Sequence, residues 1–308
     1  MYMNYKLGRK PKRIDKRTLK LGQFLVDKNL PPLPMTFDVD SQFTNMVDKN
    51  MYGNDTLGDC VIAGRAHMTL RMEDFQQQIL IPITTQDVET EYFKETGGGD
   101  TGLDMLTSLN EWRQSGWSAA GHNYTIYAFA ELELDKHSEL MYSIYLLDGA
   151  YTGFNVPQSA MDQFDNGQIW DVVPDDGGIV GGHCVYIVAY NSIGPICVTW
   201  GQRQPMTWAF WDKYFDEAYG LIDNLDSWVN PATDPLNISA LTTDLDEITG
   251  VTPPTPTPTP TPPTPPPTPP TPPCPCPLCK YLRAIYVANQ KFPKSVLDYL
   301  KKWFKAGN

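Results

Sequence analysis

The sequence lacks long apolar runs. No stretch approaches the roughly 20 consecutive apolar residues that a transmembrane helix needs. The basic start, MYMNYKLGRKPKR, is not followed by the apolar core of a signal peptide. We therefore expect no membrane span and no Sec signal peptide.

Cysteine and histidine are scarce, with six cysteines and four histidines in 308 residues. So few cysteines do not make a disulfide framework. On an expected hairpin, Cys184 and Cys197 would lie roughly 13 Å apart, beyond the ~7 Å limit for a disulfide, so we expect two free buried thiols. Near the C-terminus, Cys274, Cys276 and Cys279 offer only three ligands with no histidine after them. We expect no metal site and no cofactor, and we interpret this odd set as forming intermolecular disulfides.

The chain also lacks a net positive charge, because the total is −12. Residues 1–20 carry +7 and residues 280–308 carry +6, which leaves −25 between them. This excludes a uniformly basic nucleic-acid binder. The basic N-terminal arm, residues 1–29, has no interleaved aromatics after Tyr5, which disfavours nucleic acid. It could latch on the acidic body or dock on an anionic partner, and we favour a solvated or partner-wrapped arm.

Proline is abundant but concentrated. Residues 251–273 hold one valine, fourteen prolines and eight threonines, which predicts an extended polyproline II rod of roughly 70 Å. The chain therefore divides into the arm (1–29), a body (30–245), a Pro/Thr linker (246–273) and a tail (274–308). The tail combines its cysteines with an amphipathic basic helix, which we expect to pack on a partner, on copies of itself or on a surface.

The body is predicted to be α+β. Helical patterns cover residues 60–77, 85–95, 103–116 and 138–148, and strand patterns cover 150–154, 184–190 and 196–200. Helices precede strands and no repeat is visible. We predict a helical lobe packed against an antiparallel sheet lobe.

Two residues of the body suggest nucleophilic chemistry. Cys60 begins a helical pattern after the glycine-rich loop of YGNDTLGDC, where helix-terminal amides favour the thiolate. His183 follows a glycine-rich turn and leads directly into a strand. A histidine at the mouth of a sheet can face a helix-borne thiol, so we predict a Cys60–His183 pair for acyl transfer.

These motifs resemble papain-like cysteine peptidases. Asn54 stands six residues before Cys60, where the family has a glutamine that polarises the substrate carbonyl. His183 begins a strand like the family's histidine strand, 123 residues after Cys60. The resemblance implies that Gly98 and Gly99 meet an extended substrate and that Trp200 shields the catalytic pair. It also implies a two-lobed fold and cleavage of peptide or isopeptide bonds. Only about 50 residues precede Asn54, fewer than the family's usual propeptide adds, so we expect no classical zymogen control.

The sequence departs from the family at three positions. Val198 stands where the family has an asparagine that orients the histidine, so the orienting group would have to come from Thr199, Gln202, a backbone carbonyl or water. Asn54 is one methylene shorter than the usual glutamine. Asp59 would oppose thiolate formation if it faced the cleft.

Two functions compete at this point. One is an active thiol peptidase acting on peptide or cell-wall peptide bonds. The other is a catalytically impaired papain-like scaffold that serves as a structural or attachment protein through its arm and tail, binding other virion proteins or itself. The GNDxxGDC and TWG motifs resemble proteins encoded by tailed bacteriophages, which leads us to expect a virion-associated protein in either case.

Overall fold

The computed structural model describes residues 5–43, 50–77, 80–225, 228 and 230–250. The described residues belong to one unit, Met1–Val251, and the second unit begins at Thr252. The proline tract and the tail with Cys274, Cys276 and Cys279 therefore lie outside the described residues. The last described helix, α7 (Ile238–Thr249), continues past residue 245, where the sequence suggested that the body ends.

The first half of the body folds into helices. Helix α1 (Cys60–Gln77) is buried on all sides from Cys60 to Met72, and its arginines are neutralised by acids, as in the Arg71–Asp40 pair at 2.7 Å. Helix α2 (Thr85–Thr96) begins with a capping box formed by Thr84 and Asp87. Helix α3 (Met105–Gln114) is capped by Asp104. A small hairpin, β2 (Trp117–Ala119) and β3 (His122–Tyr124), follows these helices.

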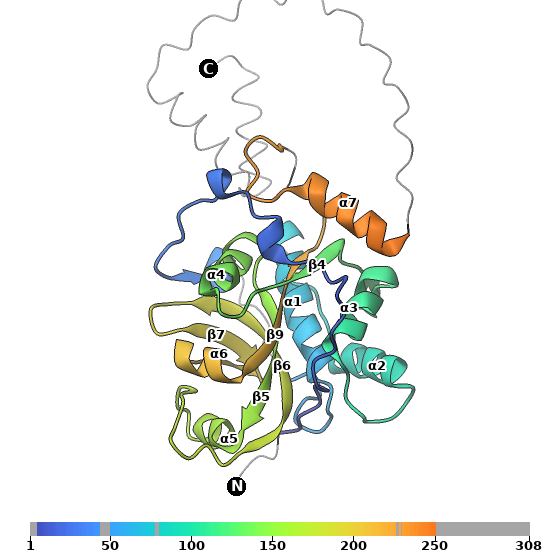
Figure 1. The fold of residues 1–308 in the computed structure, drawn as a ribbon. Coiled ribbons are helices and arrows are strands. Elements are labelled where there is room, and N and C mark those ends of the chain that lie inside the picture. The colour runs from blue at the N-terminus through green and yellow to red at the C-terminus, as the bar shows by residue number, and fades with distance from the viewer. Residues whose placement is uncertain (1–4, 44–49, 78–79, 226–227, 229, 251–308) are drawn as a thin grey trace, which may run out of the picture. The chain divides into compact units, whose positions relative to one another are not determined.

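The second half builds an antiparallel sheet in the order β4-β9-β5-β6-β7-β8, with β1 also paired to β6 (Figure 1). The strands are β1 (Phe37–Asp38), β4 (Ala128–Glu131), β5 (Ala150–Pro157), β6 (Ile179–Tyr190), β7 (Pro195–Thr199), β8 (Gln202–Pro205) and β9 (Phe215–Ile222). Three helices pack on this sheet: α4 (His137–Leu146), α5 (Gln158–Asp165) and α6 (Trp208–Tyr214). The predicted α+β class, with a helical lobe and an antiparallel sheet lobe, is confirmed.

Helix α1 joins the two lobes by packing on β5, β6 and β7. Gly64 permits the close approach, because a Cβ there would lie 3.1 Å from the Tyr151 ring and 3.4 Å from Cys184 Sγ. The Tyr151 hydroxyl donates a hydrogen bond to the Val61 carbonyl. These contacts fix the first turn of α1, and with it Cys60, against strand β6.

Strand β9 contains an irregularity that bears on the site. Glu217 pairs with Gly153 of β5, whereas Phe215 pairs with the next residue, Phe154. Asp216 is therefore an extra residue in β9, which is the pattern of a β-bulge. Successive side chains of a regular strand alternate between faces, but the bulge lets Asp216 and Glu217 turn toward the same group.

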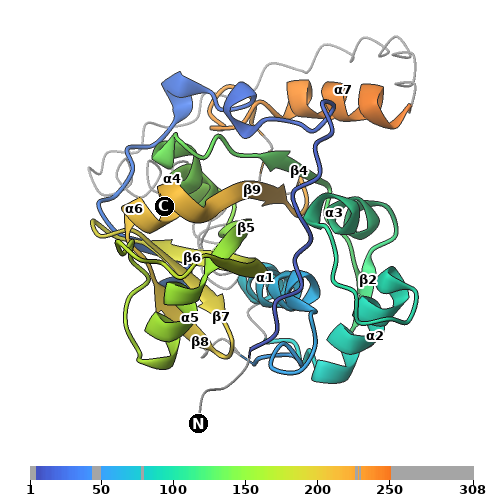
Figure 2. The same ribbon diagram turned by 60° about the horizontal axis from the view of Figure 1, so that its bottom comes forward.

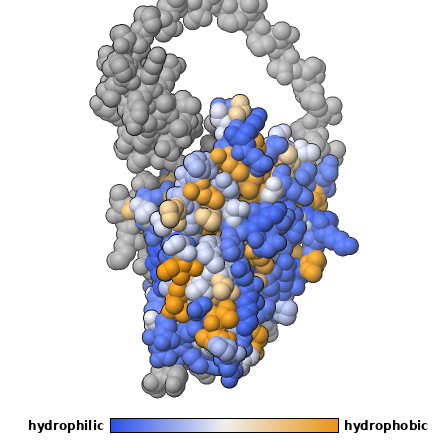
Figure 3. All heavy atoms as spheres, turned by 60° about the vertical axis from the view of Figure 1, so that its left-hand side comes forward, coloured by the Kyte–Doolittle hydropathy of each residue, from blue (hydrophilic) through white to orange (hydrophobic). Residues whose placement is uncertain are grey.

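The cysteines of the expected hairpin are buried free thiols, as predicted. Cys197 pairs with Ile187, three residues along β6 from Cys184. The surface is mostly hydrophilic with small apolar groups on the face shown in Figure 3. The large apolar side chains that are exposed in the described part are Ile14, Met35, Ile179, Val180 and Ile193. None of the described helices is both long and apolar enough to span a bilayer.

Candidate active site

Cys60 lies at the first position of α1 and is buried, with 1% of its surface exposed. The Asp59 carbonyl accepts the amides of Ile62 and Ala63 and so starts the helix. The thiol lies beside the backbones of Cys184, the residue after His183, and of Gly8 in the N-terminal arm. The structure thus places the helix-borne thiol next to the histidine strand.

His183 lies near the start of β6 and is 1% exposed. Its Nε2 forms a 2.7 Å hydrogen bond with Thr199 Oγ1. Its Nδ1 has no hydrogen-bond partner among the described residues. If Nε2 carries the proton and donates to Thr199, Nδ1 keeps its lone pair and can accept a proton from a thiol.

Thr199 therefore orients the histidine in this site. It ends strand β7, directly after Val198, and successive strand residues face opposite sides of the sheet. Thr199 faces His183, so Val198 faces away from it. The group that hydrogen-bonds the histidine therefore comes one residue after Val198. Gln202, another candidate from the sequence for this role, is exposed.

Asn54 is buried, and its amide reaches a peptide carbonyl. Its Nδ2 donates to the carbonyl of Lys6 at 3.3 Å and to that of Leu57 at 3.1 Å. Lys6 belongs to the N-terminal arm. The side chain therefore already polarises the carbonyl of a segment that crosses the site.

Trp200 forms an aromatic wall. Its ring stacks on His183 at 4.4 Å between centroids and 17° between planes. Tyr5 of the arm stacks on Trp200 at 4.7 Å and 21°. The His183 ring is thereby screened from water.

The arm runs between the helices α1 and α3 and the strands β5 and β9, where it is drawn in dark blue in Figure 2. The Leu103 amide donates to the Gly8 carbonyl at 2.9 Å, and the Lys10 amide donates to the Leu103 carbonyl at 2.8 Å. On the other side, the Arg9 amide donates to the Gly182 carbonyl at 3.0 Å. The arm is thus held by both lobes, with Gly8 beside the Cys60 thiol and Arg9 bonded to the residue before His183.

Glycine is required at position 8 by the closeness of this contact. A Cβ on Gly8 would lie 1.8 Å from the Gly58 carbonyl oxygen, which is backbone and cannot swing aside. Gly102 also lies close to the arm, because a Cβ there would lie 2.1 Å from the Gly8 oxygen. Any side chain at position 8 would force the arm out of this position.

The arm also neutralises acids of the body. Lys12 and Lys20 pair with Glu131, Lys6 pairs with Asp100, and Arg9 pairs with Glu217 at 2.6 Å. The arm therefore binds the chain's own acidic body, and the solvated or partner-wrapped arm that we favoured from the sequence is wrong. Sequence reasoning missed the buried role of Arg9, because one arginine among eight basic residues gives no distinguishing signal.

Gly98 and Gly99 occupy a different place from the peptide-contacting residues. They follow the end of α2, and a Cβ on Gly98 would meet nothing within 4 Å. The backbone that contacts the arm is that of Leu103, preceded by Gly102. Asp100, which lies between the two glycine positions in sequence, accepts hydrogen bonds from the Gly58 amide at 2.9 Å and from the Tyr92 hydroxyl at 2.6 Å.

Burial keeps both catalytic candidates neutral in this closed arrangement. Desolvation raises the pKa of the Cys60 thiol to about 11, and hydrogen bonding with the backbones of Cys184 and Gly8 only partly opposes it. Desolvation lowers the pKa of His183 to about 3, and the charge of Arg9 acts in the same direction. At neutral pH the site therefore holds a thiol and an uncharged imidazole rather than an ion pair.

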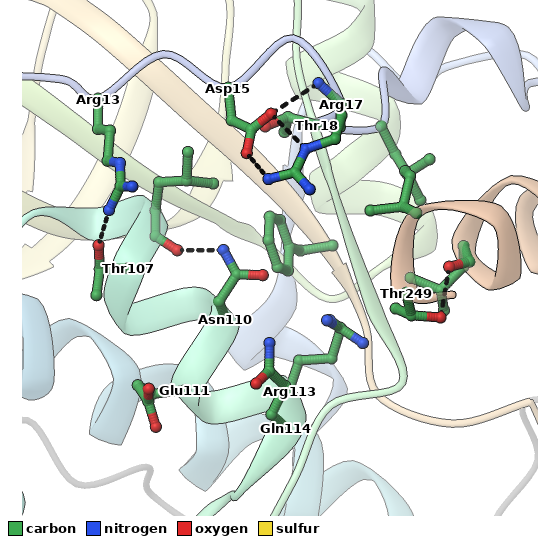
Figure 4. Close-up of a pocket in the computed structure, with 15 residues that line it drawn as sticks. Arg13, Asp15, Arg17, Thr18, Thr107, Asn110, Glu111, Arg113, Gln114 and Thr249 are labelled. Atoms are coloured by element: carbon green, nitrogen blue, oxygen red, sulfur yellow. Dashed lines mark hydrogen bonds and ion pairs between the residues drawn. The ribbon is translucent and has the colours of Figure 1, made fainter. Parts of the chain in front are cut away.

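A pocket of about 530 Å³ lies elsewhere, between the arm, α3 and α7 (Figure 4). In it, Arg13 bonds to Thr107 at 2.9 Å, and Arg17 bonds to Asp15. The pocket contains neither Cys60 nor His183. Within the described ranges, no three His, Cys, Asp or Glu side chains converge as metal ligands.

Comparison with solved structures identifies known proteins that share this fold. No protein-family model matches the chain, and no curated protein matches it. It is similar to xylellain, a cysteine protease from Xylella fastidiosa, with a TM-score of 0.57 and 14% identity over 73% of this chain and 98% of that one. It is also similar to procathepsin B S9 from Trypanosoma congolense, with a TM-score of 0.51 and 14% identity over 71% of this chain and 86% of that one. The fold is that of papain-like cysteine proteases.

Asp59 yields a prediction about stability. Its side chain is fully buried, and desolvation raises its pKa to about 8, against the pull of Asn54. Because the folded state holds a proton that the unfolded state releases near its ordinary pKa of 3.8, stability falls as the pH rises from about 4 to 8. The melting temperature of Asp59→Asn should exceed that of the wild type by a margin that grows across this window. A margin that is constant with pH would contradict the assignment.

Proposed function

We propose that this protein is a cysteine peptidase whose reacting pair is Cys60 and His183, with Thr199 orienting the histidine. The observation that carries the proposal is the arm itself. A peptide segment of this chain lies extended across the pair, with the Lys6 carbonyl bonded to Asn54 and the Arg9 amide bonded to Gly182. This segment therefore passes beside the Cys60 thiol and the start of the strand that carries His183.

The reaction follows from these positions. Cys60 Sγ attacks the carbonyl carbon of a peptide bond, and His183 Nδ1 accepts the thiol proton. Asn54 Nδ2 and the Cys60 amide stabilise the oxyanion. His183 then gives the proton to the departing amine, and water hydrolyses the thioester to regenerate Cys60 and release the acid.

The Thr199 hydrogen bond favours the enzyme over the impaired scaffold, because the orienting group that Val198 cannot provide is present. The finer proposal is that the enzyme acts on peptide or cell-wall peptide bonds as a virion-associated protein of a tailed phage. Its support is the resemblance of the Gly53–Cys60 motif to phage-encoded proteins. The attachment role of the tail stays a prediction from sequence.

Release of the arm should expose the activity. Gly8→Ala in the full chain should raise hydrolysis of a fluorogenic peptide mixture at least about 10-fold, because a tethered segment competes at an effective concentration on the order of millimolar. Lys10→Ala, at an exposed arm position, is the matched control and should behave as wild type. Adding Cys60→Ala should abolish the activity. Hydrolysis that survives Cys60→Ala, or no hydrolysis by a folded Gly8→Ala protein, would reject the peptidase.

Thr199 should act through His183. In the Gly8→Ala protein, Thr199→Val should lower kcat by about 10- to 100-fold, whereas Thr199→Ser keeps the hydroxyl and should retain most activity. Loss of the Nε2 partner also destabilises the imidazolium. The alkaline limb of the pH–rate profile should therefore move to lower pH in Thr199→Val, and an unmoved profile with full activity would exclude the positioning role.

A further inference from the structure

The side chain of Arg9 fills an acidic pocket that Asp216 and Glu217 of β9 form. Neither its guanidinium nor the Glu217 carboxylate is exposed, and each has 0% side-chain exposure. Arg9 Nη1 lies 2.6 Å from Glu217 Oε1 and 2.9 Å from Asp216 Oδ1. Nη2 donates to Asn155 Oδ1 and to Asp216 Oδ2, both at 3.1 Å.

The fold builds this pocket from several elements. The β9 bulge turns Asp216 and Glu217 toward the same guanidinium, and the Tyr219 hydroxyl holds the second Glu217 oxygen at 3.0 Å. Gly153 makes room for the arginine stem, because a Cβ there would lie 2.6 Å from Arg9 Cδ and 2.7 Å from Met105 Sδ. All of these groups belong to the body, and only Arg9 comes from the arm.

The pocket opens onto the position where a substrate would react. Arg9 reaches it from the residue whose amide bonds to Gly182, directly before His183. The preceding residue, Gly8, lies against the Cys60 thiol. A peptide bound along the same path would therefore carry one side chain into the pocket while its backbone crosses the pair.

The chemistry of the pocket selects a planar cation. A buried carboxylate without a partner is costly, so Glu217 favours a positive group. The donors of one guanidinium satisfy two carboxylates and an amide oxygen together, a fork geometry that a lysine ammonium does not offer.

We propose, resting on the peptidase function above, that this pocket selects the substrate through an arginine side chain. Arg9 occupies it as an internal substitute while the arm covers the cleft.

The test uses full-length Gly8→Ala protein and paired fluorogenic peptides. A single arginine moves through three consecutive positions on the amino side of the scissile bond, and each peptide has a citrulline counterpart, which keeps the shape of arginine but has no charge. At the favoured position, kcat/KM should be at least about 10-fold higher for arginine than for citrulline.

Two carboxylate variants identify the pocket. Glu217→Gln in the same protein should bring the ratio of kcat/KM for the arginine peptide to kcat/KM for the citrulline peptide close to one. Glu131→Gln is the matched control, because Glu131 also pairs with arm lysines but lies outside the pocket, and it should leave the ratio unchanged. Circular dichroism checks that each variant is folded, and Asp216→Asn serves as the second pocket variant if Glu217→Gln is not.

The results distinguish failure of the pocket proposal from failure of the peptidase proposal. Equal rates on arginine and citrulline peptides, or an unchanged ratio in Glu217→Gln, would overturn the pocket while leaving the peptidase intact. If neither peptide is cleaved, calorimetry measures the affinity of the same peptide pairs for the Gly8→Ala/Cys60→Ala protein, and this affinity tests the pocket without cleavage. Preference for arginine there keeps the pocket and rejects the peptidase, and equal binding rejects the pocket.

Discussion

The buried ion pair between Arg9 and Glu217 ties the N-terminal arm to the interior of the body. Neither group could stay charged there alone, because an isolated buried charge costs several kcal/mol, so each requires the other. The pair explains why a basic arm on an acidic chain lies in the cleft rather than on an outer surface. It also aligns the arm, since the Arg9 backbone bonds to Gly182 while Gly8 contacts the loop before Cys60. The closed cleft follows from this one interaction and the packing that accompanies it.

Closure also governs the protonation of the site. With Tyr5 stacked over Trp200, and Trp200 over His183, desolvation holds the thiol and the imidazole in their neutral forms. The position of Cys60 at a helix N-terminus favours the thiolate, but burial outweighs it while the arm is in place. Departure of the arm would admit water, which favours the charged forms of both groups. It would also remove the Arg9 cation, which lowers the pKa of both groups, so its loss would favour the imidazolium and disfavour the thiolate. The same segment therefore controls access to the site and the charge of its groups.

Much of this architecture could be predicted from the sequence, and the exceptions have physical reasons. The helices that begin at Cys60 and Thr85 and the strand that contains His183 were predictable because apolar periodicity and caps mark them locally. Strand β9 was missed, since Asp216 and Glu217 interrupt its apolar pattern, and their charges make sense only beside Arg9, more than 200 residues away in sequence. The orienting role of Thr199 could be named only among alternatives, because it depends on which face of β7 meets His183. Leu103 contacts the arm through its backbone, which leaves no side-chain signature, whereas the doublet Gly98–Gly99 offered a stronger pattern at another place.

The central claim is that the arm holds a competent Cys60–His183 pair closed. Its most direct test is the rate at which a peptidyl vinyl sulfone modifies Cys60, followed by peptide mass spectrometry, in wild type and in Gly8→Ala. Cys184 and Cys197 serve as internal comparators, since both are buried free thiols. The account predicts modification of Cys60 alone, at least about 10-fold faster in Gly8→Ala, because only a thiolate with an accessible cleft reacts rapidly. Equal rates in the two proteins, or modification of all three cysteines together, would contradict it.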